Sequence, residues 1–277
     1  MRYIIVFARK IIIAIRDLGQ VIGWYLEFYR ISHHRPVNKI SNIMTLGLKR
    51  VLVLSPHADD EWIGCYGLLT SESISADVLY YQFYGYDHSE SNKQIRDAEI
   101  KRCASKNGFH LYMLNELVNH SLVDILSENR YDALLCPSPY DWHWQHRLVF
   151  ESLYNEVMEL NARQAFIPRL LYYSISVPQV VSDNTYAFFM TKKQQDEKWA
   201  FFENNYVSQR MPVCRYKLQE RLNTVGLSYS GDLYTTKDVD ELKLDYAKIS
   251  DPSFMSDLDL LKNTINSVRK IREMAFD

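Results

Sequence analysis

The sequence RVLVLSPHADDE, residues 50–61, decides the fold of this chain. Its residues 51–55 form a continuous apolar run, which is typical of a strand buried on both faces in a parallel sheet. Pro56 ends the run, and the polar residues after it cannot belong to a buried strand. Because they follow the strand directly, we expect them at the carboxyl edge of the sheet, where open α/β folds bind their ligands.

Strands and helices alternate along the rest of the chain. Further apolar runs predict strands at 77–84, 111–114, 132–136 and 170–175. Helical spacing of apolar residues predicts helices at about 61–72, 90–107, 146–160 and 192–205. This order predicts an α/β fold with a doubly wound, mainly parallel, Rossmann-like sheet sandwiched by helices. Beyond about residue 210 the pattern is less regular, apart from a closing amphipathic helix that includes Leu258 and Leu261.

The composition excludes several classes of protein. The 277 residues include 32 basic and 34 acidic side chains, so the net charge of −2 offers no strong field for nucleic acid. With 47% hydrophobic residues, the chain is ordinary for a globular protein and is not disordered. The four cysteines are scattered without a C-x-x-C pair, which indicates a reducing compartment. We therefore expect a cytoplasmic protein.

The N-terminal residues 3–29 are strongly apolar but carry interspersed charges. No uncharged run approaches the roughly 18 residues of a spanning helix, and no small-residue cleavage site follows. As a helix, this segment has one apolar face, formed by Ile4, Ala8, Ile11, Ile15, Leu18, Ile22 and Tyr25. Arg2, Arg9 and Arg16 lie on another face. Such a helix either makes a peripheral contact with an anionic membrane through residues 1–30, or packs against the protein body or a second subunit.

The loop after the first strand carries potential metal ligands. Within PHADDE, residues 56–61, it holds His57, Asp59 and Asp60. Histidine and aspartate are both good zinc ligands, and a carboxylate that is not a ligand could take a proton from water. Taken alone, the loop is also compatible with a polar turn that caps a helix.

A second loop follows the strand at 132–136. It reads CPSPYDWHWQH over residues 136–146, and its His143 and His146 share a face if a helix begins there. Asp141, two residues earlier, is expected to orient the ring of His143 and hold its protonated form. An isolated H-x-x-H can equally lie on an exposed helix face.

The two loops together support a metal site more strongly than either alone, because both follow strands of the same predicted parallel sheet. His57, Asp60 and His146 would then supply three protein ligands, which leaves the open fourth position of a catalytic zinc. Asp59 and His143 would remain beside them as a base and an acid.

These loops resemble the motifs of the LmbE / PIG-L family of metal-dependent deacetylases. The chain has P-H-A-D-D-E and then Gly64-Cys65 where that family shows P-H-x-D-D-E-x-x-G-C-G-G, and D-W-H-W-Q-H for its D-x-H-x-x-H. Tyr66 departs from the family pattern, because it replaces the first glycine of the G-G pair. Weaker similarities extend the resemblance over roughly residues 50–235; they involve Arg96 with Glu99, Lys198 with Ala200, Ser208-Gln209 and residues 229–232.

The resemblance implies a role for each motif residue. It implies zinc, or another divalent transition metal, bound by His57, Asp60 and His146. It makes Asp59 the general base and His143 the acid or the stabiliser of the oxyanion.

Two further residues receive provisional roles. Arg96 would contact the substrate, the alternative being a solvated charge on a surface helix. Glu61 is expected either to support the ligands from behind or to favour the helix N-terminus as an early carboxylate.

The resemblance further implies a zinc-dependent hydrolase that removes the acetyl group from an N-acetylated amino sugar or its glycoconjugate. Its partners would be an amino-sugar small molecule, a glycolipid or a glycan, and no nucleic acid; the oligomeric state stays open. The alternatives are hydrolysis of another amide, such as a thiol-sugar conjugate, and a non-catalytic scaffold of glycan synthesis. A nucleotide-binding module is disfavoured because neither G-x-G-x-x-G nor a P-loop occurs. We expect an N-terminal amphipathic helix and hinge at 1–35, and a catalytic domain with an irregular C-terminal extension at 48–277.

Overall fold

The computed structural model describes most of the chain from residue 40 to residue 261. The described residues are 15, 18–19, 21–23, 25–26, 29, 40–85, 88–116, 122–141, 143–177, 183–209, 211, 213–224 and 230–261.

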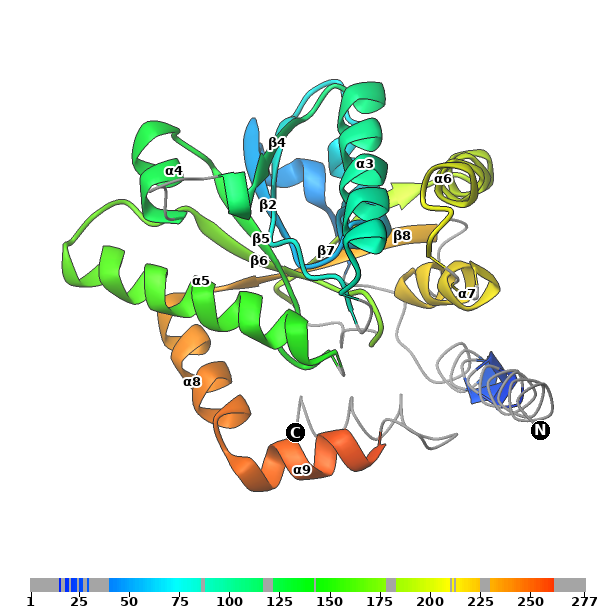
Figure 1. The fold of residues 1–277 in the computed structure, drawn as a ribbon. Helices are drawn as coiled ribbons and strands as arrows, with labels where there is room; N and C mark the ends of the chain where they lie inside the picture. Colours follow the sequence, from blue (N-terminus) through cyan, green and yellow to red (C-terminus); the bar gives the residue numbers. More distant parts are fainter. Residues whose placement is uncertain are drawn as a thin grey trace.

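An eight-stranded sheet forms the centre of the molecule (Figure 1). Its strands are β1 (Ser41–Asn42), β2 (Arg50–Ser55), β3 (Ser75–Tyr80), β4 (His110–Met113), β5 (Ala133–Pro137), β6 (Arg169–Tyr173), β7 (Thr185–Met190) and β8 (Ser230–Lys237). Their spatial order is β1-β7-β8-β6-β5-β2-β3-β4. Only β8 runs antiparallel to its neighbours β6 and β7 among the described strands, so the predicted mainly parallel α/β sheet is confirmed.

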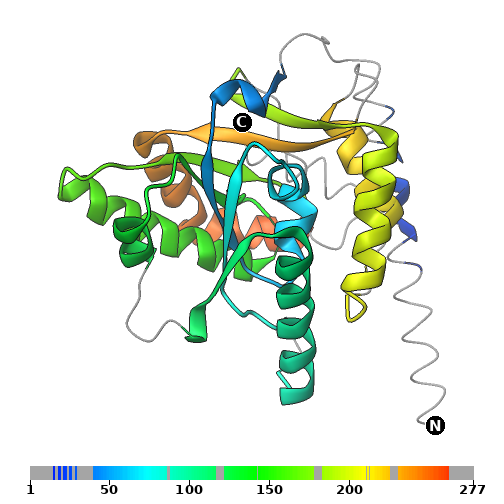
Figure 2. The same cartoon turned by 90° about the horizontal axis from the view of Figure 1, so that it is seen from above.

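Helices cover both faces of the sheet, as Figures 1 and 2 show. They are α2 (Asp60–Leu69), α3 (Glu90–Asn107), α4 (Leu122–Glu128), α5 (Trp144–Ala162), α6 (Lys192–Asn205), α7 (Val213–Asn223), α8 (Val239–Ile249) and α9 (Pro252–Leu261), with short 3₁₀ turns η1 (Ile43–Leu46) and η2 (Leu114–Glu116). Side chains of α2, α3, α6 and α7 belong to one buried apolar cluster, and those of α4, α5 and α8 to another. The sheet therefore separates two cores, as a doubly wound fold requires.

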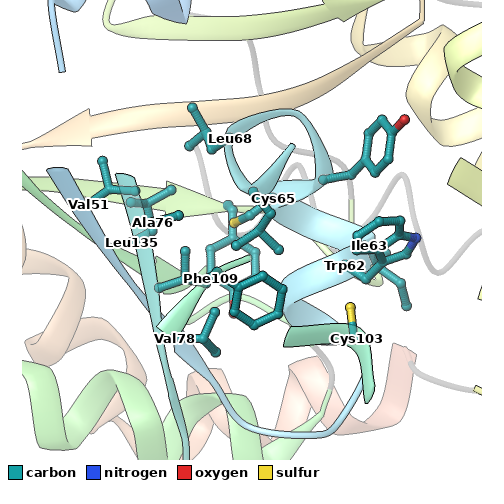
Figure 3. Close-up of a cluster of buried hydrophobic side chains, with 14 of the residues drawn as sticks. Val51, Trp62, Ile63, Cys65, Leu68, Ala76, Val78, Cys103, Phe109 and Leu135 are labelled. Atoms are coloured by element: carbon teal, nitrogen blue, oxygen red, sulfur yellow. The ribbon is translucent and has the colours of Figure 1, made fainter. Parts of the chain in front are cut away.

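The alternation of side chains along β2 explains why its sequence is apolar throughout. Val51 and Val53 belong to the first core, whereas Leu52 and Leu54 belong to the second. Figure 3 shows part of the first core, in which side chains from the strands gather against α2. Because side chains alternate between the faces of a strand, a strand buried on both faces needs apolar residues at every position.

The order of the strands reverses between β2 and β5. From β2 the chain proceeds outward through β3 to β4, and from β5 it proceeds the other way to β6. β2 and β5 are parallel neighbours, with Val51 opposite Ala133. The loops that follow these two strands therefore leave the sheet at the same edge, on either side of the switch point where such folds bind ligands.

The region beyond residue 210 is more regular than the sequence indicated. It contains α7, β8 and α8, so the expectation of an irregular extension is wrong for the described residues. β8 escaped notice because its sequence, SGDLYTTK, includes polar residues that are buried. β7 was not predicted either, and the strand expected at 77–84 ends at Tyr80. The helix α9 covers the beginning of the closing amphipathic segment, whose remainder at 262–277 lies outside the described residues.

The N-terminal segment is helical wherever the structure describes it between residues 15 and 29. The predictions for Arg2, Ile4, Ala8, Arg9, Ile11 and Arg16 fall outside the described residues. Within the described part of the chain, no helix combines the length and apolar character of a membrane span. The domain limits at 1–35 and 48–277 stay predictions, as does the cytoplasmic location.

A buried ammonium group joins three elements to α2. The Nζ atom of Lys198 lies 2.7 Å from Glu220 Oε1 on α7 and 2.7 Å from Asp232 Oδ1 on β8. It also donates to the carbonyl of Ile63 on α2, at 2.7 Å. Asp232 in turn accepts a hydrogen bond from the backbone N–H of Gly67. One cation on α6 therefore pairs with two buried carboxylates and holds the helix that begins in the first loop.

Replacing Lys198 should destabilise the fold strongly. Lys198→Ala leaves the carboxylates of Glu220 and Asp232 buried without their cation, which costs about 3–5 kcal/mol of unfolding free energy. Lys217→Ala is the matched control, because its ion pair with Asp196 is exposed and should change stability little. Urea denaturation of both variants measures the difference, and equal losses would contradict this view of the cluster.

Candidate metal centre

The first loop buries its polar side chains instead of exposing them. Asp59 immediately precedes α2, and its carbonyl accepts the backbone N–H groups of Trp62 and Ile63. Its side chain makes no capping hydrogen bond to the helix. His57, Asp59, Asp60 and Glu61 are all buried. The alternative of a solvated polar turn that caps α2 through its side chain therefore does not describe this loop.

The second loop leads from β5 into the first turn of α5. His143 is the residue before α5 and is half-buried, whereas His146 is only 2% exposed. The H-x-x-H sequence therefore does not lie on an exposed helix face. Both rings lie near His57, with ring centroids 4.5 Å away for His143 and 5.2 Å away for His146.

Three potential ligand atoms from the two loops form a small triangle. His57 Nδ1 lies 2.9 Å from Asp60 Oδ2, and His146 Nε2 lies 3.2 Å from the same oxygen. The two ring nitrogens are 3.3 Å apart. Tetrahedral zinc with bonds of about 2.0–2.2 Å would hold its ligand atoms about 3.3–3.6 Å apart. The triangle thus has nearly the size of one face of a zinc coordination shell.

Gln145 fixes which nitrogen of His57 points into the triangle. Its side-chain oxygen Oε1 lies 2.7 Å from His57 Nε2. When this amide oxygen accepts the hydrogen bond, the proton lies on Nε2. In the neutral ring the lone pair then belongs to Nδ1, the atom that faces Asp60 and His146. Sequence reasoning missed this residue, although a hydrogen-bonding side chain next to a metal-ligating histidine was a usable signal.

The three ligand atoms need positive charge nearby to offset the buried carboxylates of Asp60 and Asp141. Burial disfavours the charged form of His146, but the carboxylates of Asp60 and Asp141 outweigh it and raise the pKa of His146 to about 10. Burial likewise opposes the ionised form of Asp60, yet His146 and His57 hold its pKa well below the usual range. A proton on His146 is one source of the missing charge, and a divalent cation shared by all three atoms is another. The donor set therefore fits a metal ion.

Asp141 has a different partner from the one expected. Its place in the sequence predicts that its carboxylate contacts the ring of His143. In the structure, however, Oδ1 lies 3.5 Å from His146 Nδ1. The same carboxylate accepts the backbone N–H groups of His143 at 2.9 Å and Ser176 at 2.8 Å. The difference arises because α5 begins at Trp144 and turns the ring of His146 back toward Asp141. Asp141 therefore faces a candidate ligand as a charge partner, since His146 Nδ1 has no hydrogen-bond partner among the described residues, and it fixes the backbone of His143.

Asp59 and Glu61 are carboxyls with raised pKa values beside the triangle. For Asp59, burial is the main cause and the charge of Asp60 adds to it, while Arg96 opposes both. Burial raises the pKa of Glu61 to about 7, although hydrogen bonds from Tyr206 and other donors counteract it. Glu61 accepts hydrogen bonds from Tyr206 Oη, from Ser55 Oγ and from the backbone N–H of Asp59. It therefore supports the first loop from behind, which is one of the two roles expected for it.

His143 is uncharged near neutral pH. Burial and the nearby rings of His146 and His57 lower its pKa to about 3. Its Nδ1 atom is buried and has no hydrogen-bond partner among the described residues. Of the two roles considered for His143, a neutral hydrogen-bond donor to an oxyanion fits this environment better than a permanently protonated acid.

Arg96 lies close enough to affect the centre electrostatically. Its positive charge lowers the pKa of Asp59, and its side chain is half-buried on α3. These facts disfavour the alternative of a fully solvated helix charge; contact with a substrate stays a prediction. Tyr66, the departure from the family motif, is buried edge-on against Trp62 with ring centroids 4.9 Å apart, so its ring fills the packing around α2.

Several residues of the weaker sequence similarities contact one another or the first loop. Glu99 accepts hydrogen bonds from the backbone N–H and the hydroxyl of Ser208, at 2.8 and 2.6 Å. Lys198 binds Asp232 as described above. Gln209 donates from Nε2 to the carbonyl of Ala58 in the first loop, at 3.4 Å. Residues that carried little weight singly in the sequence are thus partners that brace the centre.

Comparisons with known proteins give structural similarities only. No family model matches the sequence, and no curated protein matches it. N,N'-diacetylchitobiose deacetylase from Pyrococcus horikoshii is similar over 69% of this chain and 85% of its own, with 19% identity and a TM-score of 0.48. The zinc-inhibited form of teicoplanin deacetylase Orf2 is similar over 68% and 97%, with 12% identity and a TM-score of 0.49. The A40926 pseudoaglycone deacetylase Dbv21 is similar over 68% and 96%, with 13% identity and a TM-score of 0.49.

Replacing Gln145 should weaken metal binding. Gln145→Met removes the oxygen that fixes the tautomer of His57, so the affinity for zinc should fall about 10–100-fold. Gln145→Glu is the matched control, because it retains an acceptor at the same place and should keep the affinity. Competition with a chromophoric chelator measures both constants. Wild-type affinity in Gln145→Met would show that Gln145 does not orient His57 for a metal.

Proposed function

We propose that this protein is a zinc-dependent hydrolase that removes the acetyl group from an N-acetylated amino sugar or its glycoconjugate and releases acetate. One observation carries the proposal: His57 Nδ1, Asp60 Oδ2 and His146 Nε2 lie within 3.3 Å of one another at the switch point of the sheet. The sugar amide as substrate class rests on the resemblance of the two loop motifs to the LmbE / PIG-L deacetylases.

His57, Asp60 and His146 would hold the metal ion, which supplies a Lewis acid that polarises a carbonyl oxygen and makes water more acidic. Asp59 takes the proton from the attacking water; one of its carboxylate oxygens lies within 4.8 Å of ligand atoms of His57 and Asp60, close enough to reach water at the centre. The raised pKa of Asp59 makes it a stronger base than an exposed aspartate. The same carboxyl group, now protonated, delivers the proton to the leaving amine, which completes the proton balance of the hydrolysis.

Neutral His143 donates a hydrogen bond to the oxyanion that forms when water attacks the amide. Its position supports this role, since its ring nitrogens come within 4.8 Å of those of His57 and His146. Arg96, on the Asp59 side of the centre, binds a polar part of the substrate. The six residues thus divide into three that hold the metal, one that moves a proton and two that bind charge or polar groups.

Exchange of Asp59 should separate catalysis from metal binding. Asp59→Asn keeps the shape of the side chain but cannot accept a proton, so kcat should fall about 10²–10⁴-fold while zinc stays bound. His57→Ala, in contrast, should lose zinc. Acetate release from N-acetylglucosamine derivatives and from non-sugar amides, with elemental analysis of each variant, measures these outcomes. If Asp59→Asn lost its zinc and Asp60→Asn kept it, the assignment of ligand and base would be reversed.

The pH profile tests the role of His143. Because its pKa is lowered to about 3, His143 does not change charge over the pH range near neutrality. Asp59 accepts a proton only when ionised, so activity should rise with pH as the carboxyl of Asp59 deprotonates. His143→Gln should therefore reduce kcat at every pH and leave the shape of the profile unchanged. A wild-type activity that falls again at high pH, with that fall absent in His143→Gln, would identify protonated His143 as the acid.

A further inference from the structure

The described part of the N-terminal segment presents an apolar stripe to solvent. Its large hydrophobic side chains are 43–65% exposed; they are Ile15, Leu18, Ile22, Tyr25, Leu26 and Tyr29. At about 100° per residue, all six fall within an arc of about 100° on a helix. These six side chains are therefore not buried in either core of the protein.

The sequence pattern extends the stripe, and the basic residues lie on the faces outside it. The same spacing brings Ile4, Phe7, Ala8 and Ile11 into the arc, and no charged residue of 1–30 falls within it. Residues 1–39 hold seven of the 32 basic residues but only two of the 34 acidic ones. The segment is thus positive while the whole chain carries a net charge of −2.

From this exposure and this charge we infer that the stripe formed by Ile15, Leu18, Ile22, Tyr25, Leu26 and Tyr29 binds the surface of an anionic lipid bilayer, with the helix lying in the plane of the interface. Apolar side chains enter the boundary between headgroups and acyl chains, and basic residues attract anionic headgroups. Tyrosines suit this boundary because their rings are apolar and their hydroxyls polar.

A second copy of the chain suits the stripe less well. If two stripes packed against each other, two positively charged segments would be brought together, and like charges repel. An anionic bilayer meets both properties of the segment, since it covers the apolar stripe and neutralises the positive charge. The inference concerns the N-terminal segment alone and does not depend on the proposed hydrolase activity.

Vesicle sedimentation of the full-length protein tests the inference. Vesicles of phosphatidylcholine alone are compared with vesicles in which anionic phosphatidylglycerol replaces part of it. We expect binding to the anionic vesicles to be about tenfold stronger or more, and to weaken with added salt. The double variant Leu18→Glu/Ile22→Glu should lose about tenfold in binding. The control Leu244→Glu/Phe166→Glu alters two exposed apolar residues elsewhere and should bind like the wild type.

Circular dichroism and thermal unfolding establish that each variant is folded, and light scattering gives its oligomeric state. Three results would overturn the inference: no binding to either kind of vesicle, equal binding to neutral and anionic vesicles, or undiminished binding of Leu18→Glu/Ile22→Glu. A wild-type oligomer that binds no vesicles and becomes monomeric in this variant would identify a second copy as the occupant.

Discussion

The parallel pairing of β2 with β5 is the constraint on which the candidate centre depends. Val51 to Val53 lie opposite Ala133 to Leu135, and Asp132 secures this register by accepting the backbone N–H groups of Lys49 and Arg50. Two loops about eighty residues apart in sequence therefore leave the sheet side by side. A change of register would move His57 away from His146. The two imidazoles would then no longer contact the same carboxylate oxygen of Asp60.

Several ionisable groups are buried around this edge, and each needs compensation because isolated buried charges are costly. The imidazoles compensate Asp60, backbone N–H groups bind Asp141, and hydroxyl and backbone donors bind Glu61. Behind α2, the ammonium group of Lys198 forms ion pairs with Glu220 and Asp232. Asp59 differs, since burial and its neighbour Asp60 raise its pKa. A carboxyl that holds its proton more tightly than usual is what proton transfer near neutral pH requires.

Much of this arrangement could be read from the sequence, and the parts that could not share a physical cause. Continuous apolar runs identified β2 and β5, and the residues after them identified His57, Asp60 and His146 as neighbours. β8 was missed because Asp232 is buried through an ion pair with Lys198, and no local pattern reveals a partner 34 residues away. The partner of Asp141 was wrong because spacing along the chain does not fix the orientation of a ring at a helix start. Gln145 was missed because its contact with His57 spans 88 residues, and no local pattern reveals such a partner.

Zinc K-edge X-ray absorption of the zinc-loaded protein, combined with single replacements of the histidines, tests the central claim most directly. One zinc ion per chain should have two imidazole nitrogens and one carboxylate oxygen as protein ligands. One imidazole should disappear from the spectrum of His146→Ala, whereas His143→Ala should leave the spectrum unchanged. Loss of an imidazole signal in His143→Ala, with the full signal kept in His146→Ala, would contradict the account. Failure of the chain to bind stoichiometric metal would contradict it as well.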